Sequence, residues 1–192
     1  MKDRIAAVMF VLLLAHGSAA AQHTKHAAKA EDTGSVTVTR SATLTVTIAS
    51  DAVGIFDYLS DSRKLVLWFP DQAIMEPHLG GKYHFRMNGT EGVWSGVVTD
   101  FIRGNKLGLT WQPPNEAAAT NVMIKLFPQG AGTAVELSHS GLTSSEALER
   151  SVTTWAFYLN NLKSVIEQGV DLRGQKQRKT THPTLTRPES NN

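Results

Sequence analysis

Residues 138–169 read SHSGLTSSEALERSVTTWAFYLNNLKSVIEQG, the end of a strand pattern followed by a long helix pattern. Thr143-Ser144-Ser145-Glu146 is a capping box, in which the threonine hydroxyl bonds the amide three residues on and the glutamate reaches back. Gly169 suits the left-handed exit of a helix. Apolar residues between these ends recur every three or four positions, which predicts an amphipathic helix. The expected buried stripe consists of Leu148, Val152, Trp155, Leu159, Leu162 and Ile166.

Strand patterns precede this helix. Residues 43–49 alternate strictly between apolar and threonine or alanine side chains, as in a half-buried strand. An antiparallel meander follows, and its clearest turn signal is Asn88-Gly89, because both residues tolerate positive φ. Val98 and Phe101 have opposite parity, which predicts a bulge between them and leaves the face of Asp100 unassigned. The strand ranges expected in the meander are 82–87, 92–101, 106–111, 121–127 and 133–140.

Two short helices are predicted between the first strand and the meander. Ser50-Asp51 caps the first of them, and Val53, Phe56 and Leu59 follow at helical spacing. Ser60-Asp61 starts the second, which must end near Pro70 because proline cannot continue a helix.

The order and spacing of these residues resemble a known family. The resemblance extends over roughly residues 43–169 and resides in Trp68-Phe69, Gly80-Gly81-Lys82-Tyr83, Leu107 with Thr110-Trp111, Gly132-Thr133, Ser138-His139-Ser140-Gly141-Leu142 and Trp155. The chain resembles the bacterial family related to the C-terminal domain of the activator of the heat-shock-protein-ninety ATPase. That family belongs to the START-like, birch-pollen-allergen-like (SRPBCC) superfamily.

The resemblance implies an α+β helix-grip fold. A curved antiparallel sheet of about seven strands would wrap a long C-terminal helix, with two short helices after the first strand and an elongated cavity between sheet and helix. The family commonly has glycine directly before the helix tryptophan, whereas this chain has Thr154. If Thr154 faces the sheet, the cavity near Trp155 is narrower than in relatives.

The N-terminus carries the pattern of an export signal. Lys2 and Arg4 precede an apolar run over residues 5–15, and Ala19 and Ala21 form an A-x-A pair. Eleven apolar residues are too few for a stable membrane anchor. We therefore expect residues 1–21 to be a signal peptide cleaved near Ala21, and the mature protein to be periplasmic or secreted without stable membrane insertion.

The remaining chain divides into a linker over residues 22–35, a domain over residues 36–170 and a basic tail over residues 171–192. The domain holds ten Lys and Arg against twelve Asp and Glu, a net charge of −2, whereas the tail holds five against two, a net charge of +3. The tail has almost no apolar residues, so we expect it to be disordered. Because it also lacks interleaved aromatic residues, nucleic-acid binding is not expected.

No catalytic or metal-binding constellation is evident. The chain contains no cysteine, which excludes disulfides, thiol catalysis and cysteine-based metal sites. The histidines at 23, 26, 78 and 182 lack the spacing of metal ligands, so neither a metal nor a cofactor is expected. Ser138 and His139 point to opposite faces of a strand and cannot pair. His139 shares the inward parity of Leu137, which fits a buried structural histidine, a polar anchor for a ligand or a general acid/base.

Aromatic side chains are expected to line the cavity, because ligand sites are mostly apolar with a few placed polar groups. The expected ligand-binding residues are Phe69, Tyr83, Phe85, Trp111, Leu137, His139, Trp155 and Tyr158. The leading hypothesis is an exported, non-enzymatic domain that binds a small apolar ligand. One alternative is a START-like cyclase, aromatase or hydrolase in which His139 and Tyr83 or Tyr158 transfer protons. Another is a co-chaperone-like domain that binds a protein partner, not identified by the sequence.

Overall fold

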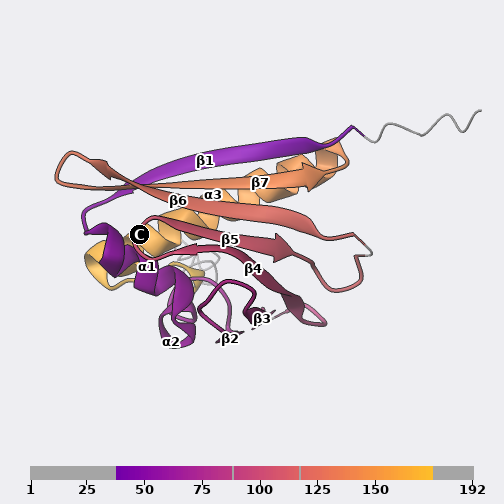
Figure 1. Cartoon of the computed structure of the whole chain (residues 1–192), viewed down its shortest axis with the longest axis horizontal. Coiled ribbons are helices and arrows are strands. Elements are labelled where there is room, and N and C mark those ends of the chain that lie inside the picture. Colours follow the sequence, from indigo (N-terminus) through magenta and orange to yellow (C-terminus); the bar gives the residue numbers. More distant parts are fainter. Residues whose placement is uncertain (1–37, 88, 117, 175–192) are drawn as a thin grey trace, which may run out of the picture. The chain divides into compact units, whose positions relative to one another are not determined.

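The computed structural model describes residues 38–87, 89–116 and 118–174, which belong to a single compact unit. The predicted signal peptide, the linker, Asn88 and the tail beyond Gly174 lie outside the described residues. In chain order the elements are β1 (Arg40–Ile48), α1 (Ala52–Ser60), α2 (Ser62–Leu65), β2 (Gln72–Met75), β3 (Lys82–Arg86), β4 (Trp94–Ile102), β5 (Lys106–Trp111), β6 (Thr120–Gln129), β7 (Gly132–Leu142) and α3 (Ser145–Gln168) (Figure 1).

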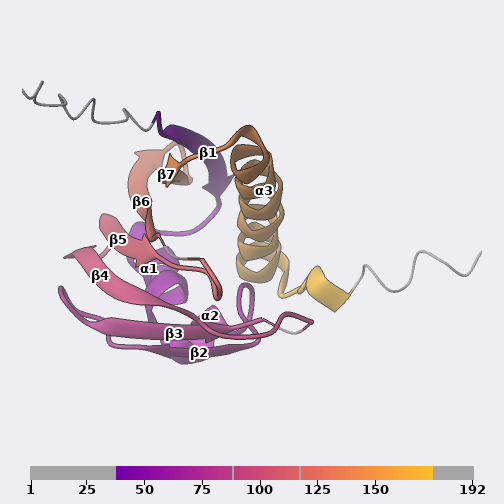
Figure 2. The ribbon, with the colours of Figure 1, turned by 90° about the vertical axis from the view of Figure 1, so that its right-hand side faces the viewer.

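The seven strands form one antiparallel sheet in the order β1-β7-β6-β5-β4-β3-β2. Figure 2 shows the sheet curving from β1 to β2, with α3 across its open concave side. This arrangement confirms the predicted helix-grip fold. β2 is the strand that the sequence pattern did not place, because it has only four residues and Ile74 within it is 67% exposed. Among the described residues, no helix combines the length and apolar character needed to cross a bilayer.

The predicted strand faces are confirmed. Val135, Leu137 and His139 of β7 are buried on the concave side, whereas Ser138 faces outward and bonds the hydroxyl of Thr43 across the sheet at 3.1 Å. The predicted bulge is also present, as a register shift between Val98 and Asp100. Period-two alternation specifies which side chains face inward, as β3 and β6 show most clearly.

One detail of the first predicted short helix, α1, and one of the predicted long helix, α3, are wrong. In α1, Val53 is 44% exposed and Ile55 is fully buried, because the face that packs on the sheet is centred on Ile55 and Phe56. In α3, the N-cap is Ser144, whose hydroxyl accepts from the amide of Ala147, in place of the expected Thr143.

The buried stripe of α3 is also rotated relative to the prediction. The prediction is confirmed for Trp155, Leu159 and Leu162, which are buried, but Val152 is 41% exposed. Further inward positions of the helix are occupied by polar residues. Because their side chains are hydrogen-bonded, burial costs little for these residues. The buried polar residues of α3 are Ser151, Asn161 and Ser164.

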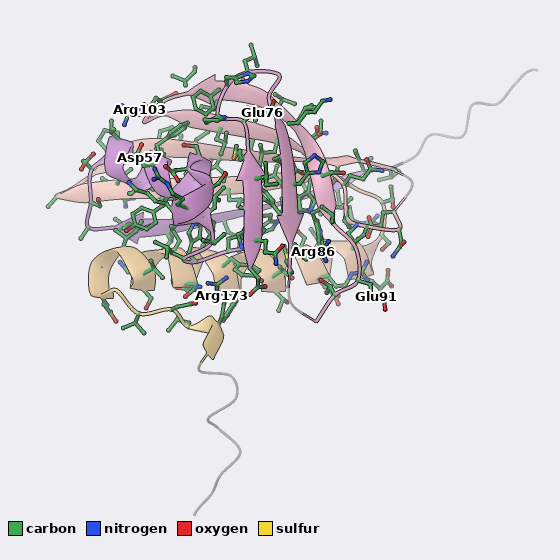
Figure 3. The ribbon with its side chains drawn as sticks, turned by 90° about the horizontal axis from the view of Figure 1, so that it is seen from below. Asp57, Glu76, Arg86, Glu91, Arg103 and Arg173 are labelled. Carbon is green, nitrogen blue, oxygen red and sulfur yellow. The ribbon has the colours of Figure 1, made fainter. Side chains whose placement is uncertain are left out.

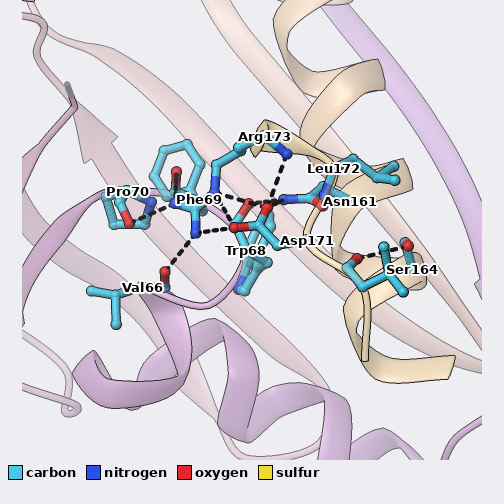
Figure 4. A network of polar contacts seen from close by, with 10 residues as sticks. Val66, Trp68, Phe69, Pro70, Asn161, Ser164, Asp171, Leu172 and Arg173 are labelled. Carbon is cyan, nitrogen blue, oxygen red and sulfur yellow. Dashed lines mark hydrogen bonds and ion pairs between the residues drawn. The ribbon is translucent and has the colours of Figure 1, made fainter. Parts of the chain in front are cut away.

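The domain continues past its predicted end at Val170. Asp171 and Arg173 form an ion pair at 2.7 Å, and Arg173 donates to the carbonyl oxygens of Val66 at 2.8 Å and Pro70 at 3.0 Å (Figure 4). Asn161 of α3 joins them, since its amide donates to Asp171 Oδ1 at 2.9 Å. The prediction of a disordered tail from residue 171 onward is therefore wrong for residues 171–173, which are held by polar contacts and not by an apolar stripe.

Candidate ligand pocket at the end of the long helix

A pocket of about 240 Å³ opens where the N-terminal half of α3 meets the ends of β3 to β7. Three tryptophans line the pocket, and most of its lining surface is apolar. The complete lining is Phe69, Met87, Trp94, Trp111, Pro113, Glu116, Thr120, His139, Leu142, Ala147, Arg150, Ser151, Thr154 and Trp155.

The space deeper between sheet and helix is filled by side chains. Only about 20 Å³ remains there, close to the volume of one water-sized probe. Phe69 occupies the centre of the filled region: its ring stacks on Trp155 at 5.5 Å and meets the edge of Tyr158 at 4.8 Å and of Phe85 at 5.7 Å. The elongated cavity implied by the family resemblance is thus reduced to the pocket at one end.

The eight residues predicted from the sequence divide into two groups. Phe69, Trp111, His139 and Trp155 line the pocket. The other four do not line it and pack in or beside the core. The phenol of Tyr83 donates to the carbonyl of Thr110 at 2.6 Å and its ring stacks on Phe85, Leu137 is fully buried, and Tyr158 contacts Phe69 from the side.

His139 is held by hydrogen bonds at both ring nitrogens. Nε2 lies 2.7 Å from Thr120 Oγ1, and that hydroxyl donates its proton to the carbonyl of Trp111 at 3.0 Å. Thr120 therefore accepts from Nε2–H. On the other side, Nδ1 accepts from the indole N–H of Trp155 at 3.2 Å and lies 2.8 Å from the hydroxyl of Ser151. An indole N–H only donates, so these contacts assign the neutral Nε2–H tautomer.

The electrostatics of the site agree with this assignment. Burial lowers the pKa of His139 from 6.5 to about 4, because the charged imidazolium loses its solvation. Burial likewise raises the pKa of the Tyr83 and Tyr158 phenols. All three candidates for proton transfer are therefore neutral near pH 7, and the free lone pair of His139 is already covered by Trp155 and Ser151.

Sequence reasoning missed most of the pocket mouth. Trp94 and Met87 adjoin the β3–β4 turn, Glu116 belongs to the β5–β6 loop, and Arg150 and Thr154 lie one turn apart on α3. The i, i+4 spacing of Arg150, Thr154 and the neighbouring Trp155 was visible in the sequence. Thr154 beside Trp155 was expected to bear on the cavity and does line the pocket, whereas Arg150 was not part of the predicted apolar stripe. The loop residues carried no signal, since which loops converge is decided by the sheet curvature.

A second hollow of about 500 Å³ lies beside α1 and α2. Its charged groups are already paired with one another. Asp57 and Arg103 lie together at this hollow (Figure 3). Asp57 accepts from Arg103 at 3.1 Å and from Lys64 at 3.3 Å, and these contacts lower the pKa of its carboxyl group. Asp61 is paired in the same way with Arg63. Within the part of the chain that the structure describes, no three His, Cys, Asp or Glu residues converge as metal ligands.

The sheet order, the long helix and the terminal pocket define a helix-grip domain of the START-like class. A family model described as activator of Hsp90 ATPase homolog 1-like protein matches residues 51–167, and the chain belongs to this family. No curated protein matches the sequence.

Solved structures share the fold at low identity. The Aha1 dimer from Colwellia psychrerythraea is 21% identical with a TM-score of 0.62, over 68% of this chain and 98% of that one. CalU16 from Micromonospora echinospora is 20% identical with a TM-score of 0.59, over 72% and 81%. The Hsp90 activator PFC0360w from Plasmodium falciparum is 20% identical with a TM-score of 0.56, over 66% and 95%. At these identities the likeness is one of fold.

Proposed function

We propose that the protein is an exported binding domain that takes up one small apolar molecule in the pocket at the N-terminal half of α3. The observation that carries the proposal is the pocket itself. It is open, about 240 Å³ in volume and walled by Trp94, Trp111 and Trp155, whereas the rest of the interior is filled. Concave, mostly apolar sites with a few polar groups are typical of small-molecule binding.

The volume limits the size of the ligand. An engineered apolar cavity of about 150 Å³ accommodates benzene, and drug-sized ligands use about 300–1,000 Å³. A pocket of about 240 Å³ therefore suits a molecule of one or two rings, or a short branched chain. Long acyl chains and sterol-sized molecules would need the deeper space that Phe69, Phe85 and Trp155 occupy.

The bonding of His139 favours binding over catalysis. A general base needs a free lone pair within reach of the substrate, and Nδ1 of His139 already accepts from Trp155. The co-chaperone alternative, suggested by the family description and by relatives such as the Plasmodium falciparum Hsp90 activator, is disfavoured by the export signal expected at residues 1–21. That chaperone and its ATP are cytoplasmic.

The direct test is to extract the purified protein with organic solvent and to identify released compounds by mass spectrometry. Titration with small apolar compounds, followed by tryptophan fluorescence, covers a ligand lost during purification, since Trp111 and Trp155 line the site. A copurified or titrated compound that is displaced by filling the pocket, as in Ala147→Phe, supports the proposal. Absence of any bound or titratable apolar compound overturns it.

A further inference from the structure

We propose that the pocket selects a small apolar monocarboxylic acid, whose carboxylate is bound by Arg150 and Thr154 of α3. This inference rests on the proposed function, because it names the chemical class of ligand for the same pocket. It is carried by the arrangement of donors and acceptors in the pocket wall.

Arg150 and Thr154 lie one helical turn apart, both line the pocket, and both are exposed at its mouth. Residues four apart on a helix project from the same face. Within residues 38–87, 89–116 and 118–174, neither side chain forms a hydrogen bond or an ion pair. Arg150 attracts Glu146 one turn earlier, but Glu146 does not line the pocket. A guanidinium and a hydroxyl are thus left facing the same space.

The other polar side chains behind them are occupied. Thr120, His139 and Ser151 bond one another in the chain that runs from the carbonyl of Trp111 to the indole of Trp155. They offer a ligand no free charge. The polar group that complements the pocket is consequently an acceptor that meets Arg150 and Thr154, and a carboxylate has the planar geometry for a guanidinium.

Glu116 restricts the ligand to a single negative charge. Among the residues that the structure describes, it is the only carboxylate in the lining; it belongs to the β5–β6 loop, whereas Arg150 belongs to α3. No ion pair joins the two in the described residues. A dianion such as a phosphate monoester would be repelled by Glu116 and meet only one guanidinium. A monoanion bound against α3 feels about half of this repulsion, because the Coulomb energy scales with the charge of the ligand, and its single charge is matched by Arg150.

The apolar end of such an acid has a matching surface. The rings of Trp111 and Trp155 lie 5.2 Å apart at 60°, and Phe69 stacks on Trp155 behind them. An aromatic ring placed there has its faces and edges in contact with indole rings, while its carboxylate reaches the pocket mouth at Arg150.

Binding of three matched probes tests the inference: 2-naphthoate, neutral 2-naphthamide and cationic 2-naphthylmethylamine, each titrated at pH 7.5 by tryptophan fluorescence and by calorimetry. We expect naphthoate to bind about tenfold or more tightly than naphthamide, because hydrogen bonds to a charged group are worth more than neutral ones. Arg150→Gln should remove most of this preference, because naphthoate loses a charge-assisted bond whereas naphthamide loses a weaker bond to a neutral acceptor. Thr154→Val should weaken naphthoate binding by about three- to tenfold.

Arg40→Gln is the matched control, since Arg40 lies near the same end of α3 and donates to the carbonyl of Thr143 but does not line the pocket. Naphthoate binding unchanged in Arg40→Gln and lost in Arg150→Gln supports the inference. Equal binding of naphthoate and naphthamide overturns it while leaving the binding function intact. Preference for the amine, abolished by Glu116→Gln, overturns it in favour of a cation. Binding of none of the probes, with no copurified compound, overturns the proposed function as well.

Discussion

The indole N–H of Trp155 donates to Nδ1 of His139 at 3.2 Å, and this contact joins α3 to the end of β7. It requires Nδ1 to be unprotonated. Protonation would set an imidazole N–H against an indole N–H, two donors with no acceptor between them. The hydrogen bond between Trp155 and His139 therefore exists only while Nδ1 of His139 is unprotonated.

We predict that the free energy of unfolding decreases as the pH falls from about 6.5 to 4. In this range His139 binds a proton in the unfolded chain but not in the folded one, because burial lowers its pKa from 6.5 to about 4. The stabilisation that neutral His139 contributes is complete above pH 6.5, is lost progressively as the pH falls from 6.5 to 4, and is absent below pH 4. Its size is up to about 3 kcal/mol, measured by urea unfolding at a series of pH values.

His139→Gln isolates this effect, because all carboxyl groups with lowered pKa values are shared by both proteins. The variant should lose about 2 kcal/mol at pH 7, since Thr120, Ser151 and Trp155 lose their common partner. Between pH 6.5 and 4 its stability should then change less than that of the wild type. Parallel pH curves for the two proteins would show that His139 titrates normally.

A second prediction concerns the C-terminal contacts of Asp171 and Arg173. Truncation after Val170 should lower the free energy of unfolding by about 2–3 kcal/mol, because the carbonyls of Val66 and Pro70 and the amide of Asn161 lose charged partners. This corresponds to a fall in Tm of roughly 5–10 °C, measured by calorimetry.

Truncation after Gly174 provides the control and should leave Tm nearly unchanged, since residues 175–192 contain no apolar stripe. Arg173→Lys separates geometry from charge. An ammonium group cannot serve several carbonyl oxygens as a planar guanidinium does, so this variant should lose about 1 kcal/mol or more. If the two truncated proteins have the same Tm, Arg173 contributes nothing to stability.

Much of the sheet could be predicted from the sequence, because successive side chains of a strand alternate between its two faces whatever the rest of the chain does. The inward faces of residues 133–139 and the bulge near Asp100 follow directly from parity. The sheet curvature and the position of α3 on it came from the resemblance, since periodicity alone indicates only a mixed sheet with an amphipathic helix.

The pocket and the C-terminal contacts were less predictable because they depend on partners distant in sequence. Ser151 reads as a surface residue until His139 is known to lie 2.8 Å from its hydroxyl. Arg173 reads as part of a solvated tail until the carbonyls of residues 66–70 are seen to face it. In both cases a polar group is buried by a hydrogen bond that no local pattern reveals.

A third prediction concerns the expected export. The protein expressed in a Gram-negative host should be found in the periplasmic fraction with an N-terminus near Gln22, because residues 5–15 and the Ala19, Ala21 pair form a cleavable signal. Ala21→Phe should block cleavage and leave the longer chain at the membrane. N-terminal sequencing of both proteins decides the matter, and an intact Met1 in the cytoplasmic fraction would contradict the prediction.

The last prediction tests the wall between the pocket and the core. Trp155 is 5% exposed, stacks on Phe69 and bonds His139, yet one side of it faces the pocket. Trp155→Ala should cost about 3 kcal/mol, near the low end for a buried tryptophan, because the pocket side already lacks protein contacts. It should also enlarge the pocket and increase binding of an apolar dye.

Two matched variants show which part of Trp155 matters. Trp155→Phe keeps a ring on Phe69 but removes the donor to His139, and should cost about 1 kcal/mol. Val152→Ala removes an apolar side chain that is 41% exposed one turn earlier, and should change stability by less than about 0.5 kcal/mol. In urea unfolding we expect Trp155→Ala to be the most destabilising variant, Trp155→Phe to be intermediate and Val152→Ala to be the least destabilising. Equal small losses in all three would mean that Trp155 does not close the core, and the pocket would then have no fixed inner wall.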